Sequence, residues 1–418
     1  MNQRDRRRLN LFLLLCVGCV LATVLFALVL VQRSREAASL TVESKAPVSD
    51  PRTPAGLPEA PPPAEQPSSA PPAEEPKRSD AKNIPTTADS KTRPSSRLLY
   101  FRANASGDAY GKLAVAPLDA LDRARYSSEL SCERVHFGGG NGVCLTRDHP
   151  QEEIQDAFRS FLMSFTAYSA VGFDEQLRPG WKIKLNGLPS RTRVSSSGRL
   201  AAITVFLSGH SYTSLSFATQ TTIVDVESGK VLADLEKFSV TRNGEVFQSS
   251  DFNFWGVTFT HDENRFYATL WSKGKTYLVE CDLEKRTANV IHEGVECPSL
   301  SPDNTRIAFK KRIVAIGAPI TFLISLLNLK TLTETPLGET RSVDDQVEWL
   351  DNDHILYALS EAPAGRCTST VSVSFDCNVN EQGPNASTDI WALPTGTDGS
   401  PHLWLKGAFS PGVAPGAN

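Results

Sequence analysis

The feature that most constrains the fold is an internal repeat that runs through residues 97–418. An apolar strand, a turn rich in Ser, Asp, Asn and Gly, and a second apolar strand recur along this region. The uninterrupted copies have their turns at residues 138–142, 197–199, 262–264, 301–304 and 351–353. A further strand follows each strand pair, at residues 113–118, 168–173, 222–226, 277–283, 324–329 and 389–393. Six copies of about 54 residues are typical of a β-propeller, in which each repeat is one blade.

The sixth strand pair is divided between the two ends of the region. Residues 408–412 have the features of a first strand and its turn, and residues 98–101 have those of the second strand. Pairing them in one blade closes the ring and leaves no long exposed sheet edge. The sequence therefore predicts an all-β fold, a six-bladed β-propeller closed by pairing of the N- and C-terminal strands.

One copy of the repeat is similar to a known family. Residues 297–309 read CPSLSPDNTRIAF, which resembles the repeat of TolB-like β-propellers, in which Pro and an apolar residue precede Ser-Pro-Asp-Gly and Ile-Ala-Phe follows. Asn304 stands where Gly is usual, and Asn is the next-best residue at positive φ. The resemblance implies a six-bladed ring used for protein or ligand contacts, in some members in the bacterial periplasm. The motif carries no catalytic residue.

The N-terminus has the pattern of a membrane anchor. Residues 1–10 form a basic tail with Arg4, Arg6, Arg7 and Arg8, and residues 11–31 carry no charge. A helix of that length rises roughly 32 Å, which matches the hydrocarbon thickness of a bilayer. We expect an uncleaved transmembrane helix with the N-terminus in the cytoplasm and the C-terminal domain outside it, in the periplasm or beyond the cell. Cys16 and Cys19 also permit a lipoprotein signal, but their neighbours fit that pattern poorly.

The segment at residues 32–96 has the composition of a disordered linker. It contains no aromatic residue, and 13 of the 27 prolines lie between Pro47 and Pro94 among Ala, Ser and Glu. Such a segment cannot bury enough apolar surface to offset the entropy of ordering it. The domains predicted are thus the tail, the transmembrane helix, this linker and a TolB-like propeller over residues 97–418.

Two further segments invite other assignments. Residues 313–329 are apolar enough to resemble a second membrane span, but the Gly-Ala-Pro at residues 317–319 interrupts them. We expect two buried strands and a turn there. Residues 150–165 have apolar side chains at helical spacing, which predicts a short helix in a connection within a blade.

The six cysteines outside the membrane segment fall into sequential pairs, Cys132 with Cys144, Cys281 with Cys297, and Cys367 with Cys377. An exported domain permits disulfides, so we expect three of them. Free buried thiols remain an alternative. A metal site is disfavoured because these six cysteines form no C-x-x-C motif, and we expect no metal or cofactor.

Charge and motifs exclude several functions. Residues 97–418 hold 30 basic and 37 acidic side chains, so no basic surface excess suggests a nucleic-acid partner. No Gly-x-Ser-x-Gly motif of an α/β-hydrolase is present. Asp262, Asp303, Asp351 and Asp353 occupy turns without the spacing of a calcium loop, so we interpret them as turn caps.

These observations predict a membrane-anchored, non-catalytic propeller that binds an envelope protein, a peptide or a cell-wall polymer. The alternative is a propeller enzyme, a hydrolase or lyase, that acts on glycans or lactones at the central channel. Acidic, His or Tyr side chains with perturbed pKa values at the channel mouth would favour the enzyme. An apolar or aromatic rim would favour binding. The sequence does not identify individual binding residues.

Overall fold

The computed structural model describes residues 97–148, 167–213, 216–315, 319–360, 387–396 and 399–414. The tail, the predicted transmembrane helix, the linker, the predicted helix at residues 150–165, and Cys367 with Cys377 lie outside the described residues. Within the described part, no helix has the length and hydrophobicity needed to cross a membrane.

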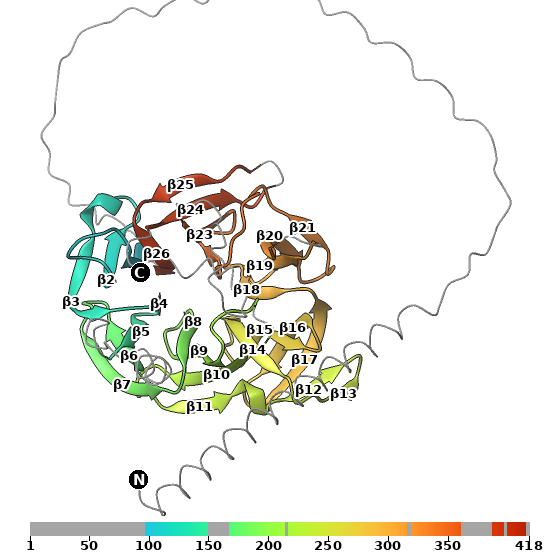
Figure 1. The fold of residues 1–418 in the computed structure, drawn as a ribbon. Coiled ribbons are helices and arrows are strands. Elements are labelled where there is room, and N and C mark those ends of the chain that lie inside the picture. The colour runs from blue at the N-terminus through green and yellow to red at the C-terminus, as the bar shows by residue number, and fades with distance from the viewer. Residues whose placement is uncertain are drawn as a thin grey trace, which may run out of the picture. The chain divides into compact units, whose positions relative to one another are not determined.

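The described residues form six antiparallel sheets arranged as the blades of a ring (Figure 1). Blade 1 contains, from the channel outward, β26 (Ala408–Ala414), β1 (Leu98–Ala103), β2 (Lys112–Pro117) and β3 (Arg125–Ser131). Blade 2 contains β4 (Arg134–Gly138), β5 (Asn141–Arg147), β6 (Tyr168–Asp174) and β7 (Pro179–Leu185). Blade 3 contains β8 (Leu188–Val194), β9 (Leu200–Ser208), β10 (Ala218–Asp225) and β11 (Val231–Asp234).

The other three blades complete the ring. Blade 4 contains β14 (Asn253–Phe259), β15 (Arg265–Ser272), β16 (Lys275–Asp282) and β17 (Thr287–Glu293). Blade 5 contains β18 (Glu296–Leu300), β19 (Arg306–Ile313), β20 (Thr321–Asn328) and β21 (Glu334–Pro336). Blade 6 contains β22 (Glu348–Trp349), β23 (His354–Ser360), β24 (Thr388–Pro394) and β25 (His402–Leu405). The helices in the described ranges are two single 3₁₀ turns, η1 (Leu121–Arg123) and η3 (Leu235–Lys237).

The ring closes as the sequence predicts. β26 from the C-terminus pairs antiparallel with β1 from the start of the domain, with Leu98 opposite Ala414 and Ala103 opposite Ala408. The C-terminal strand is the innermost strand of blade 1. The innermost strands of neighbouring blades contact one another around the channel, in the order β26, β4, β8, β14, β18 and β22. Closure therefore determines the geometry of the channel as well as that of blade 1.

Blade 4 is wider than the repeat predicts. The connection from blade 3 forms β12 (Ser239–Arg242) and β13 (Glu245–Phe247), and β12 adds to the outer edge of blade 4 in parallel with β17. Asn243 and Gly244 make the turn between them at φ 54° and 81°. An Asn-Gly pair between short apolar runs is a strong hairpin signal.

The apolar core lies between blades rather than in one central mass. Between blades 1 and 6, for example, Leu99 and Ala114 pack with Leu356 and Ile390, all fully buried. The middle strands of a blade, such as β1, β5 and β19, are mostly buried on both faces because they contact a neighbouring blade on each side. This packing explains why the blade strands read as nearly continuous apolar runs.

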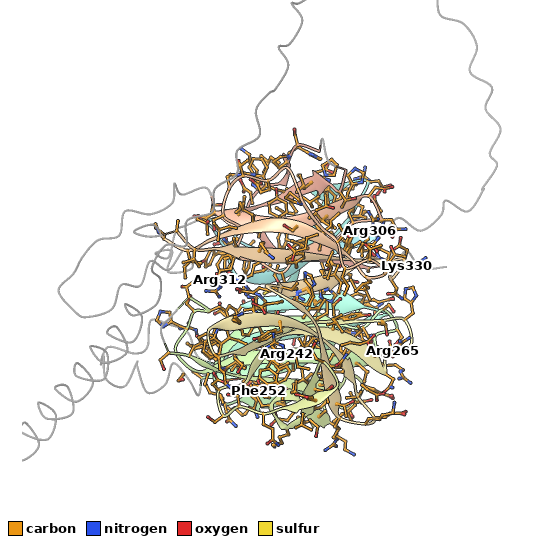
Figure 2. The ribbon with its side chains drawn as sticks, turned by 90° about the vertical axis from the view of Figure 1, so that its right-hand side faces the viewer. Arg242, Phe252, Arg265, Arg306, Arg312 and Lys330 are labelled. Carbon is orange, nitrogen blue, oxygen red and sulfur yellow. A yellow bond between two sulfur atoms is a disulfide. The ribbon has the colours of Figure 1, made fainter. Side chains whose placement is uncertain are left out.

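The two ends of the ring differ. Tight turns such as Gly139-Gly140 and Ser197-Gly198 gather at one end, which we name the turn face. The connections β3–β4, β7–β8, β9–β10 and β21–β22 lie at the other end, which we name the loop face. Figure 2 shows the ring from the side, with Arg306, Arg265 and Lys330 at the turn face and Arg312 nearer the opposite end. β1 begins at the turn face, where Arg97 donates a hydrogen bond to the Leu350 carbonyl.

Several local predictions are confirmed. Asn304 has a φ of 58°. The Asp262 carboxylate accepts a hydrogen bond from the Arg265 amide at 2.9 Å, and the Asp351 carboxylate accepts one from Asp353 at 2.8 Å, as turn caps do. The apolar segment at residues 313–329 is only partly as expected. It holds one long strand, β20, while Ile313 is the exposed end of β19.

One disulfide prediction is confirmed and one is wrong. Cys132 and Cys144 are bonded, with 5.4 Å between their Cα atoms. Cys281 and Cys297 are free and buried. Cys281 lies in the core around Phe266, whereas Cys297 packs with Tyr212 and Trp255 beside the channel. The segment between them includes β17, which leads the chain to the outside of blade 4 before it returns to the channel, so sequence proximity does not bring the thiols together.

Candidate functional site

Alternating charged residues on the two innermost strands β4 and β8 form the centre of the site. Arg134 and His136 are two residues apart on β4, and Arg191 and Arg193 are two apart on β8. Side chains at i and i+2 of a strand lie on the same face, and all four of these residues line one cavity in the channel. Arg191, Arg193 and His136 are each less than 9% exposed.

Arg193, His136 and Glu348 meet inside the channel, and we name these three residues the channel clamp. Arg193 Nη1 donates to Glu348 Oε2, and Arg193 Nη2 donates to the Val347 carbonyl at 2.9 Å. His136 Nε2 lies 3.2 Å from the same Glu348 oxygen. The amide of Val413 on β26 donates to Glu348 Oε1 at 3.0 Å. The clamp therefore links blades 1, 2, 3 and 6 across the channel.

The protonation states in the channel clamp follow from its contacts. His136 Nδ1 accepts a hydrogen bond from the Val194 amide at 3.0 Å, so the ring proton is on Nε2 and faces Glu348. Burial lowers the pKa of His136, against the effect of Glu348, which keeps the ring neutral. Burial alone would raise the pKa of Glu348, but Arg193 and His136 bring it down to about 2. Glu348 is a permanent carboxylate and cannot deliver a proton near neutral pH.

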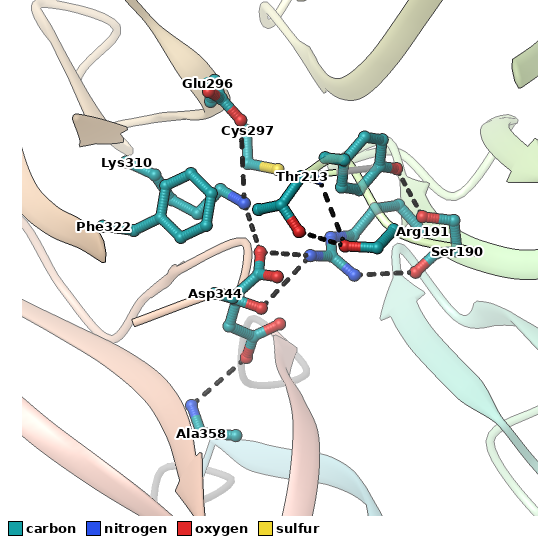
Figure 3. Close-up of polar contacts among 12 residues, drawn as sticks. Ser190, Arg191, Thr213, Glu296, Cys297, Lys310, Phe322, Asp344 and Ala358 are labelled. Atoms are coloured by element: carbon teal, nitrogen blue, oxygen red, sulfur yellow. Dashed lines mark hydrogen bonds and ion pairs between the residues drawn. The ribbon is translucent and has the colours of Figure 1, made fainter. Parts of the chain in front are cut away.

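A second ion-pair group lies nearer the loop face, where Arg191 and Lys310 meet at Asp344 (Figure 3). Lys310 is fully buried, and its ammonium contacts the Asp344 carboxylate and lies 4.2 Å from the centre of the Phe322 ring. Arg191 Nη2 is 3.5 Å from the same carboxylate. Burial opposes ionisation of Asp344, but Lys310 and Arg191 lower its pKa to about 2. This group, too, is a structural salt network with no acid poised for catalysis.

The remaining acid of this group is paired in the same way. Glu296, which is fully buried, accepts from Arg312 Nε at 2.5 Å, and Lys310 lies 4.0 Å from its other oxygen. Arg312 also donates to the Tyr212 carbonyl at 2.9 Å, which links blade 5 to the β9–β10 connection of blade 3.

Arg134 differs from the other channel cations because it lacks a carboxylate partner. Its Nε donates to the Ser190 carbonyl at 2.7 Å, and its guanidinium lies 4.3 Å from the centre of the Phe409 ring. Within the described residues, its two terminal amino groups have no hydrogen-bond or ion-pair partner. Burial, together with the like charge of Arg191, lowers the pKa of Arg134 to about 10. A guanidinium held partly out of water beside a second one is under-neutralised.

Arg134 and Arg191 line a cavity of about 170 Å³ at the loop face. Its apolar and aromatic wall consists of Tyr168, Leu188, Pro189, Phe206 and Tyr212. Its polar wall adds Glu133, Ser190, His210, Ser211 and Asp344. A second cavity of about 20 Å³, room for about one water molecule, lies deeper in the channel, and both arginines line it as well.

The confirmed disulfide adjoins this cavity. Cys132 is two residues before Arg134, and its bond to Cys144 on β5 fixes the segment that enters β4. Two sets of residues that the sequence analysis singled out therefore lie near the site. The Cys132–Cys144 disulfide adjoins it, and Cys297 lies close enough to Arg191 and Lys310 to raise the pKa of both. The arginines themselves were not predicted. The available signal was charge at alternate positions of two blade strands, as in Arg134-Val135-His136 and Arg191-Thr192-Arg193.

No family model and no curated protein sequence matches the chain. Solved structures to which it is similar include TolB from Acinetobacter baumannii, at 15% sequence identity over 77% of this chain and 67% of that chain, with a TM-score of 0.48. A candidate TolB from Agrobacterium tumefaciens is 9% identical over 75% of this chain and 89% of that chain, with a TM-score of 0.41. A candidate 6-phosphogluconolactonase from Bacteroides uniformis is 11% identical over 74% and 82%, with a TM-score of 0.38. The six blades and their closure confirm the six-bladed β-propeller fold that the sequence predicts.

Proposed function

We propose that this chain is a non-catalytic binding module of the cell envelope, held outside the cytoplasm by the helix at residues 11–31 and binding its partner at the loop face. The observation that carries the proposal is the cavity around Arg134, because it combines an under-neutralised cation with an aromatic wall. Ligand sites typically combine apolar and aromatic side chains with placed polar groups, and this cavity has walls of both kinds.

The charge pattern of the channel favours binding over catalysis. Glu348 and Asp344 both have pKa values lowered to about 2 by cations that contact them. A hydrolase or lyase that works by acid–base catalysis needs a group whose pKa lies near the working pH. The aromatic rim formed by Tyr168, Phe206 and Tyr212 also favours binding, so the enzyme acting on glycans or lactones remains the weaker candidate.

The topology supports the loop face as the binding face. The chain enters the ring at the turn face, where β1 begins, and the cavity opens at the other end. A tether attached at the turn face leaves the loop face accessible. The bond between Cys132 and Cys144 supports an oxidising compartment, because structural disulfides persist outside the cytoplasm.

The binding face can be tested with a matched pair of exposed positions. A photo-crosslinking residue replaces His210 at the loop-face cavity in one variant and Lys330 at the turn face in the other. We expect discrete crosslinked products in intact cells from position 210 and none from position 330. Products from position 330 alone, or from neither, would contradict the proposal.

The topology has its own test. A reporter that is active only in the cytoplasm is fused after Asn418. We expect it to be silent, because the basic residues before residue 11 favour a cytoplasmic N-terminus. Strong reporter activity would show that the domain is cytoplasmic.

A further inference from the structure

We propose that the loop-face cavity binds the carboxylate of a small molecule or chain end that carries one negative charge and a compact apolar body. This inference rests on the proposed binding function and assigns a ligand class to its site. It is argued from the charge balance of the channel, the free groups of Arg134 and the shape of the cavity.

The charge balance sets the sign and size of the ligand charge. Among the described residues we count the charged groups that line the two channel cavities or form an ion pair with a lining group. The five cations are Arg134, Arg147, Arg191, Arg193 and Lys310. The four carboxylates are those of Glu133, Asp344, Asp345 and Glu348. Adding Glu296 with its partner Arg312 leaves the balance unchanged. With the histidines neutral, one positive charge remains, and a monovalent anion neutralises it whereas a divalent one leaves excess negative charge.

The position of that charge is set by Arg134. Glu348 forms an ion pair with Arg193, Asp344 pairs with Lys310 and Arg191, and Glu133 lies 3.7 Å from Arg147. The fourth carboxylate, Asp345, accepts a hydrogen bond from the Ala358 amide at 3.2 Å and acts on Arg134 through space, without an ion pair among the described residues. Arg134 lines the cavity, its Nε donates to a neutral carbonyl, and its terminal amino groups have no hydrogen-bond or ion-pair partner among the described residues. A guanidinium offers parallel N–H donors that match the two oxygens of a carboxylate.

The remaining walls define the body of the ligand. Leu188, Phe206 and Tyr168 give the cavity wall its apolar and aromatic surface. A volume of about 170 Å³ is close to that of the engineered cavity of about 150 Å³ that accommodates benzene. A branched aliphatic or single aromatic group joined to a carboxylate fits this space, and a polymer segment fits only through its end.

The test is titration calorimetry on the purified full-length protein with isovalerate and benzoate as probes. Their neutral amides and inorganic phosphate are titrated in parallel. We expect saturable binding of the carboxylates and binding of the amides and of phosphate that is at least about tenfold weaker. A peptide whose C-terminus is free, compared with its C-terminal amide, distinguishes a chain end from a free small molecule as the source of the carboxylate.

The variants are Arg134→Gln, Arg134→Lys and, as a control on the turn face, Lys330→Gln. We expect Arg134→Gln to weaken carboxylate binding at least about tenfold, Arg134→Lys to weaken it less, and Lys330→Gln to leave it unchanged. Circular dichroism and the melting temperature establish that each variant folds. If Arg134→Gln does not fold, Arg134→Lys still provides the test. Equal binding by wild type and both Arg134 variants, equal binding of amide and acid, or no saturable binding would overturn the inference. Crosslinking from position 210 that persists in those cases would leave the proposed binding function standing.

Discussion

His136 and Arg193 of the channel clamp lie on β4 and β8, each two residues after Arg134 or Arg191 on the same strand. The clamp and the Arg134–Arg191 pair differ in how their charges are neutralised. In the clamp, the Arg193 guanidinium has a carboxylate, a carbonyl and a hydroxyl as partners. At the cavity, the Arg134 guanidinium donates a hydrogen bond to one carbonyl, that of Ser190, and lies near the like charge of Arg191. Buried charges that are ion-paired stabilise one arrangement of the chain, whereas an under-neutralised charge at a cavity is available to a ligand.

The largest effect is expected from removing what both regions share. Deletion of residues 406–418 removes β26, and with it the Val413 amide on Glu348 and the Phe409 ring beside Arg134. It also exposes the edge of β1 and the apolar faces of two blades. Loss of several buried side chains at roughly 1.5–3 kcal/mol each is comparable to the whole stability of an ordinary domain. We expect the deletion variant to aggregate or to unfold far below wild type in thermal melts.

A control deletion sharpens this result. Removal of residues 1–90 leaves every described strand in place, and we expect it to leave the melting temperature unchanged. If the C-terminal deletion melts within a degree or two of wild type, the ring does not depend on β26.

The next effect concerns the channel clamp. Glu348→Ala leaves the buried Arg193 without its carboxylate, and breaking a buried pair in this way costs about 3–5 kcal/mol. Glu348→Gln keeps two polar atoms in place, so we expect a smaller loss. Denaturant unfolding of the two variants and wild type measures both. A loss below about 1 kcal/mol for Glu348→Ala would show that the clamp does not stabilise the ring.

The disulfide between Cys132 and Cys144 tests the region around Arg134 at the loop-face cavity. Reduction of the bond between Cys132 and Cys144, or Cys132→Ser with Cys144→Ser, should cost roughly 3 kcal/mol and also weaken carboxylate binding, because the bond fixes the segment before Arg134. Cys281→Ser serves as the control, since that thiol is free and lies outside the channel. We expect a reductant to leave the stability of the double variant unchanged. A reductant effect of equal size in that variant would contradict this assignment.

Acid unfolding tests the ion pair of Glu348 in the channel clamp. The folded-state pKa of Glu348 is lowered from 4.5 to about 2, so its contribution to stability is complete above pH 4.5 and is lost as the pH falls towards 2. In Glu348→Gln that part of the pH dependence is absent. Between pH 4.5 and 2, the free energy of unfolding should therefore fall more steeply for wild type than for Glu348→Gln. Parallel curves would show that Glu348 is not ion-paired in the folded protein.

The sequence predicted the blades better than the site, for a physical reason. Strand alternation and turn residues are local, so the strand pairs, the Asn304 turn and the β26–β1 closure could all be predicted from the repeat. The site depends on which strands face one channel, and nothing local shows that Arg193 on β8 meets Glu348 on β22. The error at Cys281 and Cys297 has the same cause, because their separation in sequence says nothing about the path of β17 between them.

The two strands also carried a signal that the sequence analysis did not use. Charged residues at positions 134, 191 and 193 stand at alternate positions of β4 and β8. The structure places all three at the smaller cavity in the channel. The Asn243-Gly244 turn was likewise readable, and it would have predicted the extra hairpin of blade 4.

The most direct test of the account is a crossed comparison of Arg134→Gln and Glu348→Gln in the full-length protein. For each, the melting temperature is measured with and without saturating isovalerate. We predict that Arg134→Gln melts within a few degrees of wild type, because it removes an under-neutralised charge, and loses the shift caused by isovalerate. Glu348→Gln should melt lower and keep the shift. A large drop in melting temperature for Arg134→Gln together with a retained isovalerate shift would contradict the assignment of Arg134 to the ligand and Glu348 to the fold.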